Sequence, residues 1–355
     1  MIYEVPKNTK KRIRIAITHG DFNGISYEII MKALHDNRLL EMFTPVIYGL
    51  SKVLAFHRKY LNFHDFNYNI VNRAGQLNLK KINIVNLSDE QITIDFGKST
   101  SVAGKLAIAA LNKAIDDINE ANADVLVTAP LNKSNIISKD FPFAGHTGYL
   151  SNRFNNSEVV MLMVYNNLRV GTVTGHIPLK DVSNSISEQA ITSKLTVLER
   201  SLKRDFAINK PKIAVLGLNP HAGDNGVIGD EDKRIISPAI LKIRKHGSLV
   251  YGPFPADGFF GSGSYTKYDA VLSMYHDQGM IPFKTIAAEH GVNFTAGLPI
   301  VRTSPAHGTA YDIAGKNKAS ATSMREAIYL ATDIYNNRRT FDENSADPLA
   351  IGVSS

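Results

Sequence analysis

Short apolar runs alternate along the chain with longer amphipathic stretches, and this alternation is typical of an α/β protein. The amphipathic pattern is clearest in residues 185–203, where Ile191 and three leucines recur at steps of four, three and four residues and so share one helical face. Further helices are predicted at residues 24–34, 101–119 and 324–335. Buried strands are predicted at residues 12–18, 45–48, 124–127, 212–216 and 270–274.

Two apolar segments, Val159–Val164 and Arg169–Thr174, flank the turn sequence Tyr165-Asn166-Asn167 and predict a β-hairpin. A hairpin among strands that alternate with helices makes the sheet mixed rather than purely parallel. No Pro/Gly/Ser-rich linker divides the chain, which favours two domains that share strands or exchange segments across a cleft. Residues 342–355 are polar, contain a proline and show little periodicity, so we expect a frayed tail.

Composition narrows the class of protein. A length of 355 residues is typical of about two domains. The chain has no cysteine, which excludes disulfides, thiolate nucleophiles and cysteine-bound metals and fits a reducing compartment. A transition metal would therefore be bound by His, Asp or Glu. No apolar stretch is long enough to span a bilayer, and the first residues lack the apolar core of a signal peptide, so the sequence predicts a cytoplasmic protein without a membrane partner.

The formal net charge of +7 raises nucleic acid as a partner. The one dense basic run consists of Lys7, Lys10, Lys11, Arg12 and Arg14, which we expect to form a solvated segment before the first strand. The excess of positive over negative charge is modest, and an anionic small-molecule substrate explains this excess as well as a nucleic acid does. Aromatic residues are not interleaved with the basic ones, so a non-catalytic metal-binding or nucleic-acid-binding protein is the remote alternative and no nucleic-acid partner is predicted.

Histidines gather in loops that follow predicted strands, where open α/β sheets bind their ligands. Glycine or proline borders most of these loops, and we expect the histidines to point out from the sheet. The five are His19, His146, His176, His221 and His276. Of these, the last three could converge as an open divalent-metal site, or each could be an ordinary hydrogen-bonded loop histidine. Asp277, beside His276, is placed to orient an imidazole.

A second concentration of small and polar residues runs from His307 to Lys318. It could let the backbone approach a dinucleotide, or it could be a glycine-rich connection before the next helix. No G-x-G-x-x-G follows a strand, and no phosphate-binding Walker A sequence is present. Lys284, Asn293 and Arg302, which follow the last histidine loop, would suit a phosphorylated or carboxylated substrate.

Six motifs then occur in a characteristic order: VTAPLNK at 127–133, GHT at 145–147, LNPHAG at 218–223, GPFPAD at 252–257, MYHDQG at 274–279, and GLP through RTS at 297–304. Together they resemble the 4-hydroxythreonine-4-phosphate dehydrogenase family of vitamin B6 biosynthesis, from about Ile15 to Ala331. The resemblance implies an isocitrate/isopropylmalate dehydrogenase-like fold, with two α/β/α domains, a mixed sheet and a cleft between the domains. It implies a first domain of residues 1–145 plus 308–355 that includes the NAD-binding loop, and a second of residues 146–307 for metal binding and dimerisation.

The resemblance also implies roles for single residues. A divalent metal ion (Zn, Mg or Co) would be bound by His176, His221 and His276. The phosphorylated small-molecule substrate would be bound by His146, Thr147, Lys284, Asn293 and Arg302. NAD would be bound by His307, Gly308, Thr309, Ala310 and Asp312. The site would lie at the interface of a homodimer and be shared by both subunits.

The implied reaction is the NAD-dependent oxidation of 4-phosphohydroxy-L-threonine at C3 to 2-amino-3-oxo-4-phosphooxybutanoate. That product decarboxylates to 3-amino-2-oxopropyl phosphate, on the route to pyridoxal 5'-phosphate. Asp277 and Lys284 are the candidates to take the hydroxyl proton. Related dehydrogenases act on D-erythronate or D-threonate 4-phosphate, and more distant ones on a cyclic dihydrodiol dicarboxylate.

The first glycine-rich loop departs from the family pattern. Asp21, Gly24 and Glu28 are kept, but Phe22 and Tyr27 stand where the family usually has prolines. We expect these bulky aromatic side chains to reshape one wall of the cleft, and this departure bears on substrate identity more than on fold or metal binding.

Overall fold

The computed structural model describes residues 12–138, 141–143, 145–155 and 158–346. Its described strands form one twelve-stranded sheet in the order β3-β4-β2-β1-β5-β12-β11-β6-β7-β10-β8-β9. The strands are β1 (Ile13–Thr18), β2 (Phe43–Gly49), β3 (Tyr68–Val71), β4 (Ile82–Asn86), β5 (Val125–Thr128), β6 (Val160–Tyr165), β7 (Leu168–Thr172), β8 (Lys212–Leu216), β9 (Leu249–Phe254), β10 (Ala270–Ser273), β11 (Val292–Ala296) and β12 (Arg302–Pro305).

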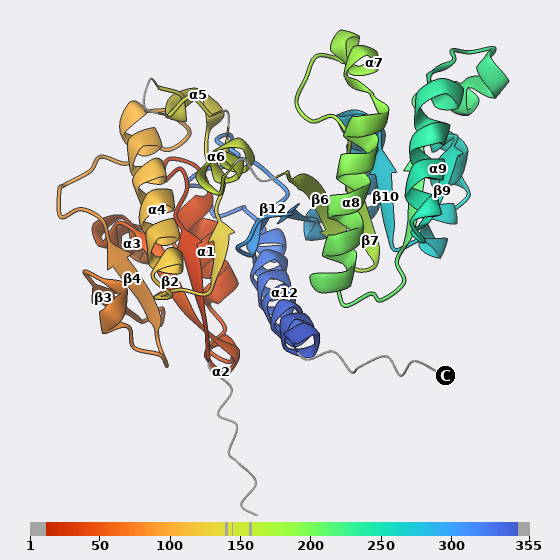
Figure 1. Ribbon diagram of the computed structural model, residues 1–355. Coiled ribbons are helices and arrows are strands. Elements are labelled where there is room, and N and C mark those ends of the chain that lie inside the picture. Colours follow the sequence, from red (N-terminus) through yellow and green to blue (C-terminus); the bar gives the residue numbers. More distant parts are fainter. Residues whose placement is uncertain (1–11, 139–140, 144, 156–157, 347–355) are drawn as a thin grey trace, which may run out of the picture.

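Helices cover this sheet along its length, with α3 and α4 at one end, α8 and α9 at the other, and α12 between them (Figure 1). The α-helices are α1 (Ser26–Leu34), α2 (Leu39–Met42), α3 (Ser51–Tyr60), α4 (Ser101–Asn119), α5 (Lys133–Ile136), α6 (His146–Arg153), α7 (Val182–Ser185), α8 (Glu188–Arg204), α9 (Ser237–Lys245), α10 (Ala256–Gly261), α11 (His276–Ala287) and α12 (Thr322–Ala346). Short helical turns are η1 (Ala74–Gln76), η2 (Leu179–Asp181), η3 (Pro220–Gly226), η4 (Asp232–Ile236), η5 (Ser264–Lys267) and η6 (Ala288–His290).

The sheet is mixed, as predicted, and its antiparallel pairs lie in the middle. There β11 runs antiparallel to both β12 and β6, and β6 forms the predicted antiparallel hairpin with β7. The strands on either side pair in parallel. Since hydrogen bonding runs without a break from β5 through β12 to β6, the two halves share one sheet. The assignment of residues 1–145 with 308–355 to one domain and 146–307 to another stays a prediction.

The core explains why β1 reads as an almost continuous apolar run. Ile15 and Ile17 pack on one face of the sheet, while Ala16 packs on the other, and all three side chains are fully buried. A strand buried on both faces cannot alternate apolar with polar residues. On one of these faces lies α4, where Thr100 caps the helix by accepting a hydrogen bond from the Ala103 amide.

Several predicted boundaries are confirmed and one is wrong. The helix predicted at residues 101–119 and the strand at 212–216 coincide with α4 and β8. The tail expected to fray from residue 342 is helical as far as Ala346, because α12 is fixed there by contacts to α8 that are described below. Residues 347–355 lie outside the described part of the chain.

The basic run near the N-terminus lies mostly outside the described residues, because Lys7, Lys10 and Lys11 precede residue 12. Arg14 does not belong to a solvated segment. It lies in β1 and forms an ion pair of 2.9 Å with Asp124, which is 6% exposed. No helix in the described ranges combines the length and the apolar character needed to cross a membrane.

Candidate active site

A cavity of about 410 Å³ opens at the middle of the sheet, where the parallel and antiparallel strands meet. Strands β5, β6, β11 and β12, the first turn of α6 and one side of α11 contribute to its walls. Its polar lining side chains are Thr128, Lys133, His146, Thr147, His176, His276, Lys284, Asn293, Arg302, Ser304 and His307. The cavity therefore gathers basic and neutral polar groups, and no Asp or Glu among the described residues lines it.

This cavity brings together most of the residues singled out from the sequence. All five predicted substrate contacts line it, together with two of the three predicted metal ligands and the first two residues of the predicted cofactor loop. These nine are His146, Thr147, Lys284, Asn293, Arg302, His176, His276, His307 and Gly308. The five that do not line it are His221, Asp277, Thr309, Ala310 and Asp312.

His176 and His276 lie side by side, with ring centroids 5.2 Å apart. They follow β7 and β10, which are neighbours in the sheet, so their loops leave the same edge. Partial burial lowers the pKa of His176, and the nearby positive charges of Lys133 and His276 lower it further. The neutral imidazole that results is the form that binds a metal ion.

The carboxylate of Asp277 contacts His276 and does not line the cavity. Its Oδ1 lies 2.7 Å from Nδ1 of His276. A carboxylate in that position fixes the imidazole tautomer and leaves Nε2 free as a ligand. The role anticipated from the sequence, orientation of an imidazole, matches this geometry.

His221 lies outside the cavity. It follows β8, one strand beyond β10, and its side chain is exposed. Its backbone has φ of 55° and begins a left-handed run that continues to Asn225. Asn219, at the start of this loop, is held by Glu231 and Asp232. Within the described residues of one chain, no three His, Asp or Glu side chains come together as a metal site.

Arg302 is the most unusual group in the cavity. Only 2% of it is exposed, and it donates hydrogen bonds to the hydroxyls of Thr128 and Thr295 at 2.6 and 3.1 Å. No carboxylate pairs with it among the described residues. Burial lowers the pKa of its guanidinium to about 9. A buried cation without a counter-ion is costly, so an anionic ligand is the natural partner.

Two lysines add to this positive charge. The side chains of Lys133 and Lys284 have no hydrogen-bond or ion-pair partner in the part of the chain that the structure describes. Burial, together with the charges of Arg302 and Lys133, holds the pKa of His146 well below its usual value. Lys133 and Thr128 were not assigned roles from the sequence, although both lie in the VTAPLNK motif, which was the available signal.

The connection between β12 and α12 is fixed closely against the first half of the chain. The amide of Ile25 donates to the carbonyl of Thr309 at 3.1 Å. A Cβ added to Gly24 would lie 2.6 Å from that same carbonyl oxygen, so only glycine fits there. Glu28 accepts a hydrogen bond of 2.8 Å from the amide of Ala319. Two of the residues kept from the family pattern, Gly24 and Glu28, therefore hold this connection in place.

A second hollow, of about 490 Å³, adjoins the cavity and shares Lys284, Ala306, His307 and Gly308 with it. Its other walls are mostly apolar and include Ile25, Phe283, Ala310 and Ile313. Of the five predicted cofactor-binding residues, His307, Gly308 and Ala310 line this hollow, while Thr309 and Asp312 do not.

Two expectations about the first loop are wrong. Phe22 and Tyr27 are fully buried and do not line the cavity, so they do not reshape its wall. His19 does not point out from the sheet either, because it is fully buried and stacks on Tyr27 with ring centroids 5.5 Å apart. The two aromatic residues fill the core between α1 and its neighbours instead of the two prolines of the family pattern.

Comparison with known proteins gives one consistent result. The sequence profile of the family described as "Pyridoxal phosphate biosynthetic protein PdxA" matches residues 41–331. A relative from Bacteroides thetaiotaomicron, named 4-hydroxythreonine-4-phosphate dehydrogenase, is 49% identical over 341 residues, covering 96% of this chain and 93% of the relative.

Solved structures agree with this. The crystal structure of 4-hydroxythreonine-4-phosphate dehydrogenase from Klebsiella pneumoniae is 36% identical, with a TM-score of 0.78 over 91% of this chain and 99% of that one. A terephthalate 1,2-cis-dihydrodiol dehydrogenase from Burkholderia xenovorans is 25% identical, with a TM-score of 0.60 over 91% and 98% of the two chains. The fold is therefore that of the first of these dehydrogenases.

Proposed function

The chain belongs to the family described as pyridoxal phosphate biosynthetic protein PdxA, and we propose that it oxidises 4-phosphohydroxy-L-threonine at C3 with NAD as the hydride acceptor. The observation that carries the proposal is a set of three cationic side chains in the cavity that also holds His176 and His276. These three, Lys133, Lys284 and Arg302, have no carboxylate partner in the part of the chain that the structure describes. A substrate with a phosphate at one end and a carboxylate at the other complements these cations.

The chain's own residues account for substrate binding. Arg302, Lys133 and Lys284 supply the charge for the phosphate and carboxylate, and Thr147 adds a hydroxyl at the start of α6. The side-chain oxygen of Asn293 is buried and accepts no hydrogen bond from the described residues. An ammonium group on the substrate would donate a charged hydrogen bond to it, which is stronger than the neutral one that a hydroxyl would donate, and this favours the amino acid over a hydroxy acid. These contacts orient the substrate.

A divalent ion fits the two histidines that line the cavity. Partial burial and neighbouring charges favour the neutral form of His176, and Asp277 orients His276. When bound, the ion would polarise the C3 hydroxyl, and NAD would accept the hydride. Because His221 lies away from this cavity in its own chain, the third ligand would come from the His221 of a second copy. The proposal therefore includes a homodimer that shares each site.

Lys284 is the residue we place at the proton transfer. Lys284 lines the cavity and its side chain has no partner among the described residues, whereas Asp277 is engaged with His276 outside the lining. The neutral amine form of Lys284 takes the C3 hydroxyl proton during oxidation and so becomes the ammonium form, which is the cation of the cavity. The product carries a carboxylate β to the new carbonyl, so it can lose CO2, and the resulting carbanion takes up a proton that Lys284 can return. The final product is 3-amino-2-oxopropyl phosphate.

The apolar hollow beside the cavity is the proposed place for NAD. Its walls include His307, Gly308 and Ala310. It adjoins the active-site cavity at Lys284, where the proposed reaction takes place. Thr309 takes part differently, because its carbonyl fixes the connection to Ile25. The absence of a G-x-G-x-x-G motif is consistent with a cofactor bound by this connection. The cytoplasmic location expected from the sequence stays a prediction.

D-erythronate and D-threonate 4-phosphate are the second candidate substrates, because the same cations complement any 4-phosphorylated four-carbon acid. NADH formation with each compound separates the two proposals. We expect turnover of 4-phosphohydroxy-L-threonine and at least about tenfold lower kcat/KM for both hydroxy acids, because a hydroxyl in place of the ammonium removes a charged hydrogen bond. The opposite order of kcat/KM would assign the chain to the hydroxy acids.

A further inference from the structure

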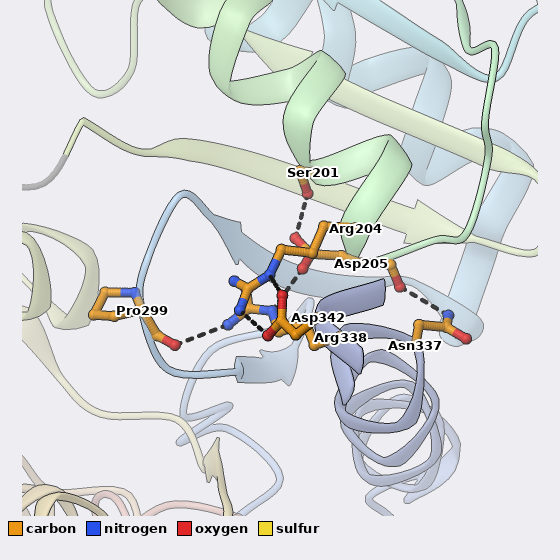
Figure 2. Close-up of polar contacts among 7 residues, drawn as sticks. All are labelled: Ser201, Arg204, Asp205, Pro299, Asn337, Arg338 and Asp342. Atoms are coloured by element: carbon orange, nitrogen blue, oxygen red, sulfur yellow. Dashed lines mark hydrogen bonds and ion pairs between the residues drawn. The ribbon is translucent and has the colours of Figure 1, made fainter. Parts of the chain in front are cut away.

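A separate hollow of about 540 Å³ lies between α8 and α12, behind the turn that joins β11 to β12. It shares no lining residue with the candidate active site. Three arginines line it: Arg200 and Arg204 from α8 and Arg338 from α12. Figure 2 shows Arg204 and Arg338 beside each other, with the turn at Pro299 on one side.

Arg338 is the buried member of the three. It is 7% exposed, its Nε pairs with Asp205 at 2.6 Å and its Nη1 donates to the carbonyl of Pro299 at 3.1 Å. Its Nη2 has no hydrogen-bond partner among the described residues. Asp205 also accepts from Ser201 at 2.6 Å, so this carboxylate is already fully engaged. One hydrogen-bond donor of this buried guanidinium group, Nη2, is therefore available to a ligand in the hollow.

The two other arginines differ in how they are paired. Arg204 forms a bidentate pair with Asp342 at 2.9 and 2.6 Å, and about half of the Asp342 side chain is exposed. Arg200 makes no hydrogen bond or ion pair with any described residue. The remaining carboxylate of the lining, Glu158, is paired with Lys194. The hollow thus has positive charge that its own carboxylates do not match.

The charges of the arginines converge close to Asp342. Its pKa lies below the usual value, chiefly because Arg204 donates hydrogen bonds to it, and Arg338 and Arg200 contribute further, while burial acts in the opposite direction. The charges of all three guanidinium groups thus favour an anion at this place.

We propose that this hollow binds a phosphate-bearing small molecule, with the phosphate held by Arg200 and the free Nη2 of Arg338, close to Arg204. Guanidinium groups match phosphate oxygens in geometry and stay charged at neutral pH. The hollow is much larger than a phosphate ion, so the ligand carries a further group. A ligand bound there would bridge α8 and α12, which contact each other and both pack against β11. The proposal is independent of the reaction at the candidate active site.

The test needs a protein whose active-site cavity no longer attracts phosphate. Lys133→Glu/Lys284→Glu reverses two of the three cations of that cavity. Inorganic pyrophosphate is then titrated into this variant by calorimetry, and we expect one site per chain. Adding Arg200→Gln is expected to weaken that site by about tenfold or more, because a charged hydrogen-bond donor is lost. Adding Arg200→Lys should weaken it less.

Arg73→Gln is the matched control. It removes the same charge from an exposed position after β3, outside the lining of either cavity, and should leave the affinity unchanged. Thermal unfolding verifies that each variant is folded. The absence of binding in the Lys133→Glu/Lys284→Glu protein would overturn the proposal, as would equal affinities for the Arg200→Gln and Arg73→Gln proteins. Neither result bears on the proposed reaction, which is tested with the unmodified chain.

Discussion

The hydroxyl of Tyr311 donates a hydrogen bond of 2.7 Å to Oδ2 of Asp21, and so joins the loop after β1 to the connection before α12. Asp21 is fully buried and also accepts hydrogen bonds from the side chain of Asn135 and the amide of Asn23, both at 2.9 Å. Burial and the bond to Asp21 raise the pKa of Tyr311 to about 12, so the phenol stays a donor at neutral pH. The shape of the proposed NAD-binding connection therefore depends on the buried carboxylate of Asp21 as well as on that of Glu28.

Tyr311→Phe removes this bond together with the hydrogen bond of 3.1 Å that the Tyr311 hydroxyl accepts from the side chain of Asn132. We expect the KM for NAD to rise several-fold with a smaller change in kcat, because the connection loses a fixed point while the cationic cavity is untouched. The free energy of unfolding should fall by about 1 kcal/mol. Initial rates measured at a series of NAD concentrations give the KM and kcat, and so check the expected rise in KM. Tyr265→Phe, whose hydroxyl has no partner among the described residues, is the control, and equal KM values in the two variants would contradict the assignment.

Arg302→Met tests the buried cation. The guanidinium is buried and has no carboxylate partner among the described residues, so its removal should cost little stability and change the melting temperature by only a few degrees. We expect kcat/KM for the phosphorylated substrate to fall by about a hundredfold or more, since a charged, bidentate contact is lost. A variant with kcat/KM within tenfold of the unmodified protein would show that Arg302 does not bind the substrate.

Stability should fall on mild acidification, because His19 and His57 are buried. Burial lowers the pKa of each imidazole to about 4, against about 6.5 in an unfolded chain. Their contribution to stability is therefore present above about pH 6.5 and is lost as the pH falls from 6.5 towards 4. Linkage gives a loss of about 2 kcal/mol for each histidine between pH 7 and pH 5.

His57→Phe isolates one of these contributions. The phenyl ring can keep the stacking on Tyr27, whose ring centroid lies 5.2 Å from that of His57. Urea unfolding at pH 7 and pH 5 should show a loss in the variant that is about 2 kcal/mol smaller than in the unmodified protein. The same loss in both proteins would mean that His57 is not protonated on unfolding in this range.

Asp277→Asn should weaken metal binding without emptying the site. An amide can still contact Nδ1 of His276 but no longer strengthens the imidazole as a ligand, and we expect the affinity for Zn²⁺ to fall by at least about tenfold. Competition with a chelating dye measures this change. Asp65→Asn is a matched control, because Asp65 forms an Asp–His pair of 3.2 Å with His35 on the surface. Equal losses of affinity in both variants would exclude a specific role for Asp277.

The helices and strands predicted correctly are those whose bounds are determined by residues within the segment itself. The bounds of α4 and β8 follow from periodicity and caps within the segment itself. The extension of α12 could not be predicted this way, because Arg338 and Asp342 are fixed by Asp205 and Arg204, more than a hundred residues earlier in the chain.

In the candidate active site, too, the sequence predicts the local features but not those that depend on contacts between distant segments. The types of its residues were evident from the sequence, but the meeting of His176 and His276 depends on β10 lying beside β7, a strand order that no local pattern encodes. His221 was grouped with them because it also follows a strand, and only the sheet order shows that its loop lies one strand further out. Phe22 and Tyr27 could not be assigned to the core from the two positions alone.

The central claim is a metal-dependent oxidation in the cationic cavity, and NADH formation from 4-phosphohydroxy-L-threonine tests it most directly. The rate is followed by absorbance in protein as purified, after removal of metal with EDTA, and after addition of Zn²⁺, Mg²⁺ or Co²⁺ to the stripped protein. The account predicts NADH formation that is lost on chelation, restored by at least one of these ions, and absent in His276→Ala under every condition. Turnover that persists unchanged in the stripped protein and in His276→Ala would contradict it.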